Sequence, residues 1–598
     1  MASTNHDPVV AVDDPPFVVR EDALTAPEQP CEILIVAFPG VQRFIESGRT
    51  TADLWAASAI RSEISHSVVT ALNEASVDGC ELIFPSQAKP KSRLGVPNRI
   101  VIKCEPERGK DLAKIAVEAA RKHWTKLLEQ VGSGGDSWAT QRNIVIWVVG
   151  SGDTYQDAWV NAQNALVARR RIRDFDAQLR ASPRGACRSC GIAPAVATPQ
   201  GLDHWMRSNE MLCPVCLTKR WRRKDSYFPF PSTSTVAAAP YAKMVAASND
   251  DNVKTTSKKL AALIQDQRDT RGSFKGIRGL ERFNNEVLAH DGQWMFPENW
   301  SRPSGDNDTT AQRESPEGRE AASALSKAVG SQPATYLAIL AQDADKLGQY
   351  LSKKPSIGGH QAVSNLLCDA GDAQIRALED EVILGTVIYA GGDDLLAFVP
   401  AKTALQAAFT AQEIFRNTFL LGAVNPSNEA AAITAQQIFR EKTVLQASSA
   451  VVFFHRSYPL SAAMRIAREA LLQAKLEGRD RVSVVVVRRG GERARVVLPW
   501  MQAGKCPIRT LDELVKMFSN DEGALSPRCV NTVANEVRGL SELSDKAKLL
   551  EIKRITRRHG DTSGDGADAI YGLFKAAQAP TALVEAMTIA RFLSQEGR

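Results

Sequence analysis

The order in which strands and helices follow one another limits most strongly what this chain can fold into. Between residues 31 and 183 the segments CEILIVAF, CELIFP, RIVIKCEP and NIVIWVVG predict strands, while residues 52–75 and about 108–130 repeat apolar residues at helical spacing. A further helix, TYQDAWVNAQNALVARRRIRDF, leads out of this segment. The order approximates β-α-β-β-α-β, which is the ferredoxin-like pattern. We therefore expect one α/β domain over residues 31–183.

The same order returns between residues 331 and 499. TYLAILAQ predicts a strand, EVILGTVIYA and LLAFVP predict a hairpin, and KTALQAAFTAQEIFRNTFL predicts a helix. SSAVVFF, LSAAMRIAREALLQAKLEG and RVSVVVVRR then predict a strand, a helix and a strand. Two units with one order of elements indicate a weak internal duplication. The expected fold class is α+β, with two ferredoxin-like domains and helical domains around them.

The rest of the 598 residues divides by composition, because a chain of this length exceeds a single core. We expect a disordered tail at 1–30, a zinc-binding segment at 184–225, a mainly helical linking domain at 226–330 and a helical bundle at 500–598. The stretch SRPSGDNDTTAQRESPEG within the linking domain predicts a mobile loop, because it contains almost no large apolar residue.

Composition limits the surroundings of the protein. The formal net charge of +6 permits a nucleic-acid partner without requiring one. No apolar run approaches the roughly 20 residues that span a bilayer, and the N-terminus lacks the pattern of a secretory signal. Four of the ten cysteines form two CxxC pairs and the others are scattered, which favours a reducing compartment over a disulfide framework. We expect a cytoplasmic protein without a membrane partner.

The two CxxC pairs carry the most specific local signal. CRSC and CPVC are separated by 22 residues, and each turn aims two sulfurs at one point. Four thiolates complete a tetrahedral shell and leave no open position, so the expected zinc is structural. The expected ligands are Cys187, Cys190, Cys213 and Cys216.

A basic run follows the second pair, and it allows two interpretations. Cations around an aromatic ring suit phosphate and base contact, whereas a solvated charged loop has the same composition. The candidate RNA-binding residues are Lys219, Arg220, Trp221, Arg222 and Arg223.

Acidic residues mark the second ferredoxin-like unit. Its first strand ends in AQDADKLG, and its hairpin turns at GGDD. The end of the first strand lies beside the central hairpin in this fold, so these carboxylates should converge and bind magnesium or manganese. The glycines permit a tight turn and close approach of a nucleotide. The residues concerned are Asp343, Asp345, Gly391, Gly392, Asp393 and Asp394.

Two cations near the end of the last predicted helix of this unit, LSAAMRIAREALLQAKLEG, complete the pattern. Lys475 and Arg479 are four residues apart, hence expected on one helical face, where they suit a triphosphate. The alternative is that they are ordinary solvated helix charges. Strand alternation also indicates that Asp393 and Asp394 do not both bind metal unless the turn redirects one of them.

With these motifs, residues 331–499 resemble the palm domain of nucleotide cyclases and polymerases: GGDD corresponds to the GGDEF hairpin of diguanylate cyclases, and AKLEGRD is similar to their AK-xx-GR signature. From about residue 31 to 598 the chain resembles the large polymerase–cyclase subunit of type III-B (Cmr-type) CRISPR effector complexes. The stretches FPGVQRFIESGRTTADLWAAS, ELIFPS with GVPNR, ALVARRRIRDF and FFHRSYPLSAAMRIAREALLQAK carry this resemblance.

The resemblance implies that ATP is the substrate and cyclic oligoadenylate the product, made when target RNA pairs with a guide RNA in a complex with other Cmr-type subunits. It implies two divalent ions held by Asp343 and by one or both of Asp393 and Asp394, with the glycines, Asp345, Lys475 and Arg479 near the nucleotide. The alternatives are another AMP-containing adduct, a linear product, or a non-catalytic RNA-binding scaffold.

Three departures from the family pattern carry expectations of their own. ELIFPS replaces a GGDD hairpin, so the first palm should be degenerate and serve as one wall of the nucleotide pocket. Ala344 replaces the glycine of an Asp-Gly-Asp run. The His-Asp pairs are His6-Asp7 and His290-Asp291, neither in the context of a helical nuclease domain, so we expect no HD nuclease activity.

Overall fold

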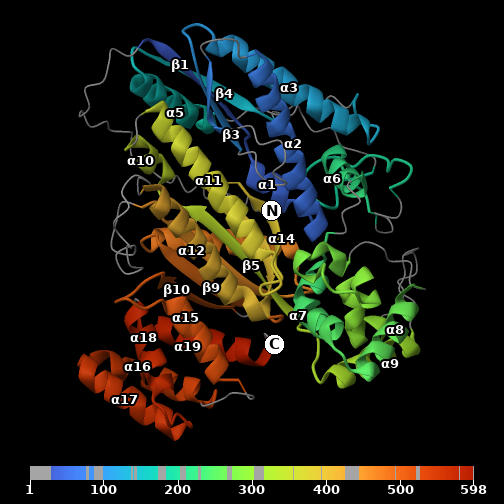
Figure 1. Ribbon diagram of the computed structural model, residues 1–598, viewed down its shortest axis with the longest axis vertical. Helices are drawn as coiled ribbons and strands as arrows, with labels where there is room; N and C mark the ends of the chain where they lie inside the picture. The colour runs from blue at the N-terminus through green and yellow to red at the C-terminus, as the bar shows by residue number, and fades with distance from the viewer. Residues whose placement is uncertain are drawn as a thin grey trace, which may run out of the picture.

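The computed structural model (Figure 1) describes residues 29–596 apart from 76–79, 87–97, 136–143 except Ala139, 173–183, 203–209 except Met206, 226–229, 266–272, 302–314, 354–355, 392, 424–443, 492, 520–524 and 578. Most of the expected N-terminal tail and residues 302–314 of the expected mobile loop lie outside the described residues, as does Gly392. The loop prediction is wrong for its last residues, 316–318, because they begin a helix whose N-cap is Ser315.

The first sheet is built as the sequence predicts. Its strands are β1 (Cys31–Ala37), β2 (Glu81–Phe84), β3 (Arg99–Cys104) and β4 (Ile146–Gly152), in the antiparallel order β2-β3-β1-β4. Its helices are α1 (Val41–Glu46), α2 (Thr51–Ala75), α3 (Gly109–Glu129) and α5 (Tyr155–Arg171). Side chains of β1 alternate between faces: Leu34 and Val36 share a core with α2 and α3, while Ile33 and Ile35 pack with α5.

The second sheet repeats this order and extends it. Its strands are β5 (Tyr336–Ala344), β6 (Thr386–Ala390), β7 (Asp394–Pro400), β8 (Ala447–His455), β9 (Arg481–Val487) and β10 (Arg493–Pro499), in the order β10-β9-β8-β5-β7-β6. Its helices are α10 (Leu347–Ser352), α11 (Ile357–Leu378), α12 (Ala404–Ala423) and α14 (Leu460–Leu476). Only β8 and β9 run parallel among the described strand pairs. The fold class predicted from the sequence is confirmed.

Parts of this unit differ from the prediction. The strand expected from residue 381 begins only at Thr386, because Asp380 accepts hydrogen bonds from the amides of Val382 and Ile383 and Leu384 has a positive φ of 59°. Helices α10 and α11, between β5 and β6, were not predicted, and neither was strand β10. It pairs antiparallel with β9 and forms the edge of the sheet.

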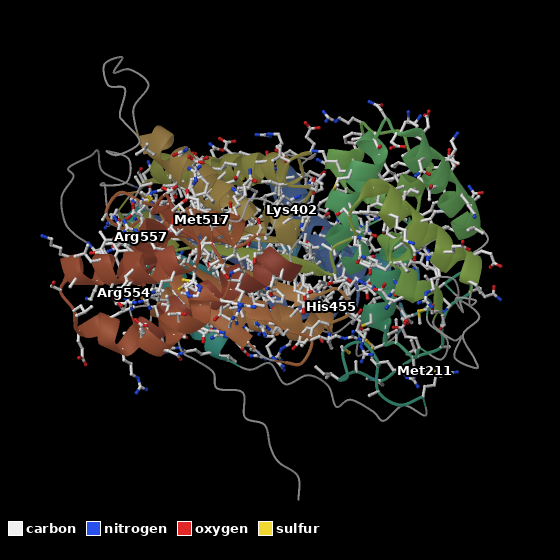
Figure 2. The ribbon with its side chains drawn as sticks, turned by 90° about the horizontal axis from the view of Figure 1, so that it is seen from below. Met211, Lys402, His455, Met517, Arg554 and Arg557 are labelled. Carbon is white, nitrogen blue, oxygen red and sulfur yellow. The ribbon has the colours of Figure 1, made fainter. Side chains whose placement is uncertain are left out.

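Helices surround the second sheet. The linking region contains α7 (Thr233–Ala247), α8 (Asp251–Gln265) and α9 (Pro316–Val329), with 3₁₀ turns η2 (Phe274–Gly276), η3 (Arg278–Leu280), η4 (Glu286–Ala289), η5 (Gly292–Met295) and η6 (Pro297–Ser301). The C-terminal helices are α15 (Pro507–Met517), α16 (Cys529–Glu542), α17 (Asp545–Arg558), α18 (Asp565–Ala576) and α19 (Pro580–Glu596). They share a core with β9 and β10. In the view of Figure 2, Arg554 and Arg557 lie on the opposite side from Met211. None of the helices in the described ranges is long and apolar enough to cross a membrane.

Helix α11 joins the two sheets. It contacts β2 of the first sheet and β6 of the second, and its apolar residues share a core with α5. The buried His360 ring lies on Trp159 and forms a 2.7 Å hydrogen bond between Nδ1 and Tyr155 Oη. Burial lowers the pKa of His360 to about 4, so the ring is neutral at pH 7. The first domain is therefore held against the second by a packed and hydrogen-bonded interface.

Candidate nucleotide site and cysteine cluster

Strand register brings two of the predicted aspartates together. Asp343 of β5 lies directly opposite Asp394 of β7, and directly opposed residues of antiparallel strands point to the same face, with Cβ atoms about 5 Å apart. Hydrogen bonds from the amide of Gly391 to the Asp394 carbonyl, 2.9 Å, and from the amide of Ala344 to the Asp393 carbonyl, 2.7 Å, hold the turn. Asp394 therefore belongs to the sheet face that carries Asp343, and Asp393 lies in the turn before it.

The three carboxylates are crowded. Burial raises the pKa of Asp343, while Lys475 acts in the opposite direction. The pKa of Asp393 is raised to about 6, although the residue is partly exposed to solvent. The main cause is that surrounding protein atoms reduce the hydration of its carboxylate, and the second is the nearby charge of Asp343. Burial and the charges of Asp393 and Asp343 raise the pKa of Asp394 well above its ordinary value. Three ionised carboxylates at this spacing repel one another, and a bound cation would relieve the repulsion.

Lys475 reaches this face from α14. Its Nζ lies 2.5 Å from Asp343 Oδ1, because α14 packs on the side of the sheet to which Asp343 points. The expected helical pairing with Arg479 is wrong: α14 ends at Leu476, and Arg479 follows with a positive φ of 62°. Arg479 nevertheless lies close enough to lower the pKa of Asp343. Both cations therefore act on the acidic face, although they do not share a helix.

The structure corrects the expected role of Asp345. Its side chain is buried and accepts hydrogen bonds from Ser448 Oγ and from the amide of Asp480, at 2.8–2.9 Å. Asp480 in turn lies 3.8 Å from the buried Arg416 of α12. Asp345 thus ties β5 to β8 and to the loop after α14. Its charge also raises the pKa of Asp343, so it lies near the acidic face, where its carboxylate is occupied by these hydrogen bonds.

The three aspartates do not form a closed ligand set. Within the described ranges, the group of three or more side chains placed to hold a metal ion consists of the four cysteines. Asp343, Asp393 and Asp394 lie near enough to raise one another's pKa, but Asp343 is paired with Lys475 and Asp393 lies in the turn. Their joint binding of a metal ion stays a prediction. Magnesium sites commonly use only one or two carboxylates together with substrate phosphates, and Asp343 with Asp394 fits that pattern.

Two arginines of the first domain also act on this site, and sequence reasoning missed them. Arg99 begins β3 and Arg170 lies near the end of α5, and both interact electrostatically with Asp393. Burial and the neighbouring Arg170 lower the pKa of Arg99 to about 10, so it stays charged at pH 7. Only the packing of one domain on the other reveals this proximity, since Arg99 is separated from Asp393 by almost half of the chain.

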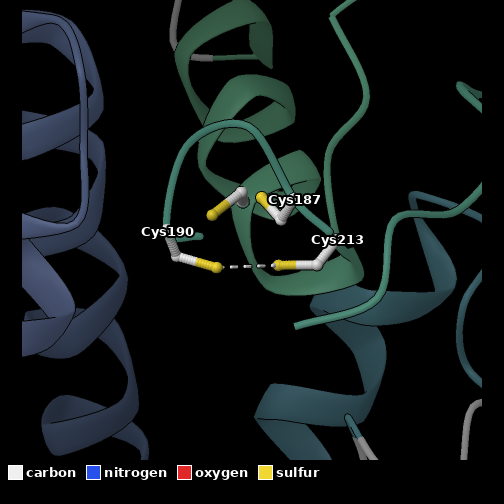
Figure 3. A group of neighbouring side chains, drawn as sticks. Cys187, Cys190 and Cys213 are labelled. Atoms are coloured by element: carbon white, nitrogen blue, oxygen red, sulfur yellow. Dashed lines mark hydrogen bonds between the residues drawn. The ribbon is translucent and has the colours of Figure 1, made fainter. Parts of the chain in front are cut away.

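The four predicted cysteines come together (Figure 3). Their sulfur atoms all lie within 4.8 Å of one another, and Cys190 Sγ is 3.9 Å from Cys213 Sγ. Neighbouring thiols raise the pKa of Cys213 and Cys216, since four sulfurs at this distance cannot all ionise without a cation. The donor set and its spacing fit a tetrahedral zinc ion.

The basic run after these cysteines is not a free RNA-binding surface, and that interpretation is wrong for its first residues. It lies on α6 (Pro214–Asp225), and Lys219 is 1% exposed with Nζ 2.7 Å from Ser47 Oγ. The buried Arg220 pairs with Asp53 and Glu210 at 2.7 and 3.1 Å. Arg222 pairs with Glu63 of α2, and Trp221 packs against the core. The charges hold the cysteine segment to α1 and α2.

The pair His290-Asp291 has a structural role. Asp291 caps η5 by accepting from the amide of Gln293 and also accepts from Ser232 Oγ, both at 2.9 Å. Neither residue belongs to a cluster placed to hold a metal ion in the part of the chain that the structure describes. The expected lack of HD nuclease activity stays a prediction.

The fold and the acidic hairpin define a protein with two palm domains of the nucleotide-cyclase type. Residues 336–483 match the family model "Cas10/Cmr2, second palm domain", and residues 33–129 match "CRISPR-associated protein Cmr2, N-terminal". These matches confirm the resemblance predicted from the sequence, to the Cas10/Cmr2 subunit of type III-B.

Individual relatives agree with the family models. The "CRISPR system Cmr subunit Cmr2" of Pyrococcus furiosus is 25% identical over 281 residues, which are 42% of this chain and only 29% of that protein. The fold is shared with two "Type III-B Cmr-beta" cryo-EM structures. The apo state has a TM-score of 0.63 and 14% identity, covering 95% of this chain and 82% of the other. The state bound to cognate target RNA has a TM-score of 0.66 and 12% identity, covering 94% and 83%.

Proposed function

We propose that this protein is a nucleotidyltransferase that polymerises ATP into cyclic oligoadenylate as a subunit of an RNA-guided type III CRISPR complex. The observation that carries the proposal is the pairing of Asp343 with Asp394 on one face of a palm domain, with Lys475 beside them. Paired carboxylates and a nearby cation are what transfer of a nucleotidyl group to a ribose hydroxyl requires.

Asp343 and Asp394 would hold the divalent ions, with Asp393 beside them. When bound, magnesium or manganese lowers the pKa of the attacking 3′-hydroxyl and neutralises the departing pyrophosphate. Gly391 leaves room for the Asp394 carboxylate, since a Cβ at that position would lie 3.0 Å from Oδ1. Lys475 holds Asp343 until a triphosphate arrives, and phosphate oxygens then offer its ammonium group an alternative partner.

The first domain would supply the wall opposite the hairpin. Arg99 and Arg170 bring positive charge toward Asp393 from that domain, where it suits the phosphates of a second nucleotide. Zinc at the four cysteines would be structural, because four thiolates leave no position for substrate. The expected partners are guide RNA, target RNA and other Cmr-type subunits.

One assay tests the proposal. The complex is assembled with guide RNA and matching target RNA, supplied with magnesium and radiolabelled ATP, and its products are resolved. We expect cyclic oligoadenylate from the wild type and none from Asp393→Asn/Asp394→Asn. A linear product, or one that needs a second small molecule, would favour the other AMP-containing signals. No product, or equal product from the variant, would favour a scaffold.

A further inference from the structure

Strand β6 carries an irregularity just before the acidic turn. Val387 pairs with Ala397 of β7, but the next pair along the ladder is Tyr389 with Leu396. One residue, Ile388, is therefore extra on β6, which is the definition of a β-bulge. Bulges commonly change the direction in which a side chain points, and they are frequent beside active sites.

The bulge decides which face Tyr389 occupies. In a regular ladder Tyr389 would pair with Leu395, whose side chain belongs to the core on the far face of the sheet. The extra residue places Tyr389 opposite Leu396 instead. Leu396 is two residues from Asp394 and so shares its face. In agreement, Tyr389 packs on the same core as Leu396 and Ile388.

Tyr389 is therefore a diagonal neighbour of Asp394 on the acidic face, a spacing of about 7–8 Å that long side chains bridge. Burial is the largest cause that raises the pKa of the Tyr389 phenol, followed by the charges of Asp394, Asp343 and Asp393. All three carboxylates are therefore near the phenol. A phenol is protonated at pH 7 and donates a hydrogen bond.

The carboxylates differ in the donors they already have. Asp343 accepts from Lys475. Among the described residues, the carboxylate of Asp394 accepts no hydrogen bond from another side chain, and Tyr389 Oη has no partner either. A neutral donor and an acceptor without a donor thus lie beside each other on one face.

We propose that Tyr389 is a positioning residue for the divalent ion: when the ion binds, the Tyr389 hydroxyl donates to the Asp394 carboxylate and holds it in the orientation that binds the ion. Metal-binding carboxylates are commonly oriented by such a hydrogen bond, and its loss costs about 10–100-fold in metal affinity or activity. This inference rests on the proposed nucleotidyltransferase function, because it assigns the ion to Asp394.

The test is the substitution Tyr389→Phe in the full-length chain, which removes one oxygen. Binding of Mn²⁺ is followed by electron paramagnetic resonance, with Asp394→Asn identifying this site. We expect about tenfold weaker Mn²⁺ binding at it and a similar increase in the Mg²⁺ concentration for half-maximal product formation. The KM for ATP at saturating Mg²⁺ should change little. Tyr350→Phe is the matched control, since Tyr350 packs on Phe419 and its pKa is shifted by burial alone.

Without divalent ions, the melting temperature of Tyr389→Phe should equal that of the wild type, because the hydroxyl makes no hydrogen bond within the described, ion-free protein. Unchanged Mn²⁺ binding and an unchanged Mg²⁺ requirement would overturn the inference. Weaker Mn²⁺ binding together with a wild type that makes no product from ATP would support the positioning role and contradict the proposed function. Equal Mn²⁺ binding by the wild type and Asp394→Asn would overturn both.

Discussion

The two sheets share an order of four strands, β2-β3-β1-β4 and β6-β7-β5-β8, but they carry opposite charges at one position. In the second sheet the end of the first strand faces the start of the third strand as Asp343 opposite Asp394. In the first sheet the same position holds Ala37 opposite Arg99. The shared fold thus supplies a geometry, and the residues at the strand ends decide what it binds.

The difference is complementary. Arg99 acts on Asp393 across the interface, so the sheet without a carboxylate at this position contributes a cation to the sheet that has two. A degenerate copy of a fold can therefore remain part of a site.

The largest expected effect concerns what holds the two sheets in place. Helix α2 contacts both α6 of the cysteine segment and β6 of the second sheet, so loss of zinc should loosen all three. Structural zinc contributes about 10–16 kcal/mol in small zinc-binding peptides. We expect Cys213→Ser to remove zinc and to lower the melting temperature by roughly 5 °C or more.

The control for this substitution is Cys368→Ser, which changes a cysteine of α11 outside the cluster. Melting is followed by calorimetry, and zinc is measured by elemental analysis of the full-length chain. Less than about half an equivalent of zinc in the wild type would contradict coordination by four thiolates.

A smaller effect tests the cation of the first sheet directly. Arg99→Gln removes a positive charge that acts on Asp393 and that we propose binds a nucleotide phosphate. A hydrogen bond from a charged group contributes about 1.5–3 kcal/mol. We expect the rate of product formation at limiting ATP to fall about tenfold, with the KM for ATP rising more than kcat falls. Arg121→Gln on the exposed side of α3 is the control. Equal kinetics for both variants would show that the first sheet is only a support.

The smallest effect concerns the acidic side. The pKa of Asp393 is raised from 3.8 to about 6, so between these pH values the folded protein binds more protons than the unfolded one. Stability is therefore lost as the pH rises through this window. Without divalent ions, we expect the wild type to lose stability relative to Asp393→Asn between about pH 4 and pH 6. Saturating Mg²⁺ should reduce this loss. If the melting temperatures of the two proteins changed equally with pH, the proposed crowding of carboxylates would be contradicted.

Local patterns were sufficient for most of the framework. Short apolar runs predicted β1, β3, β5 and β8, and helical spacing predicted α2 to within one residue. They failed at residues 381–385, where Asp380 binds the amides that a strand would need. They also failed at Arg479, since a helix signature does not show that the helix ends at Leu476.

Burial was the property that local patterns could not supply. Lys219 and Arg220 appear in the sequence as an exposed basic run, but partners on α1 and α2 enclose them. Those partners lie more than 150 residues away in the chain. Carboxylates neutralise Arg220, while a carbonyl and a hydroxyl bind the Lys219 ammonium group, so neither cation is available to a phosphate.

Spacing within short segments was enough to predict most of the elements, the cluster of four cysteines and the three acidic positions. Only the tertiary structure decided that Asp394 faces Asp343, that a bulge turns Tyr389 toward them, and that Arg99 approaches from the other sheet. These relations depend on strand register and on the packing of distant segments, and a one-residue change in register moves a side chain to the opposite face of a sheet.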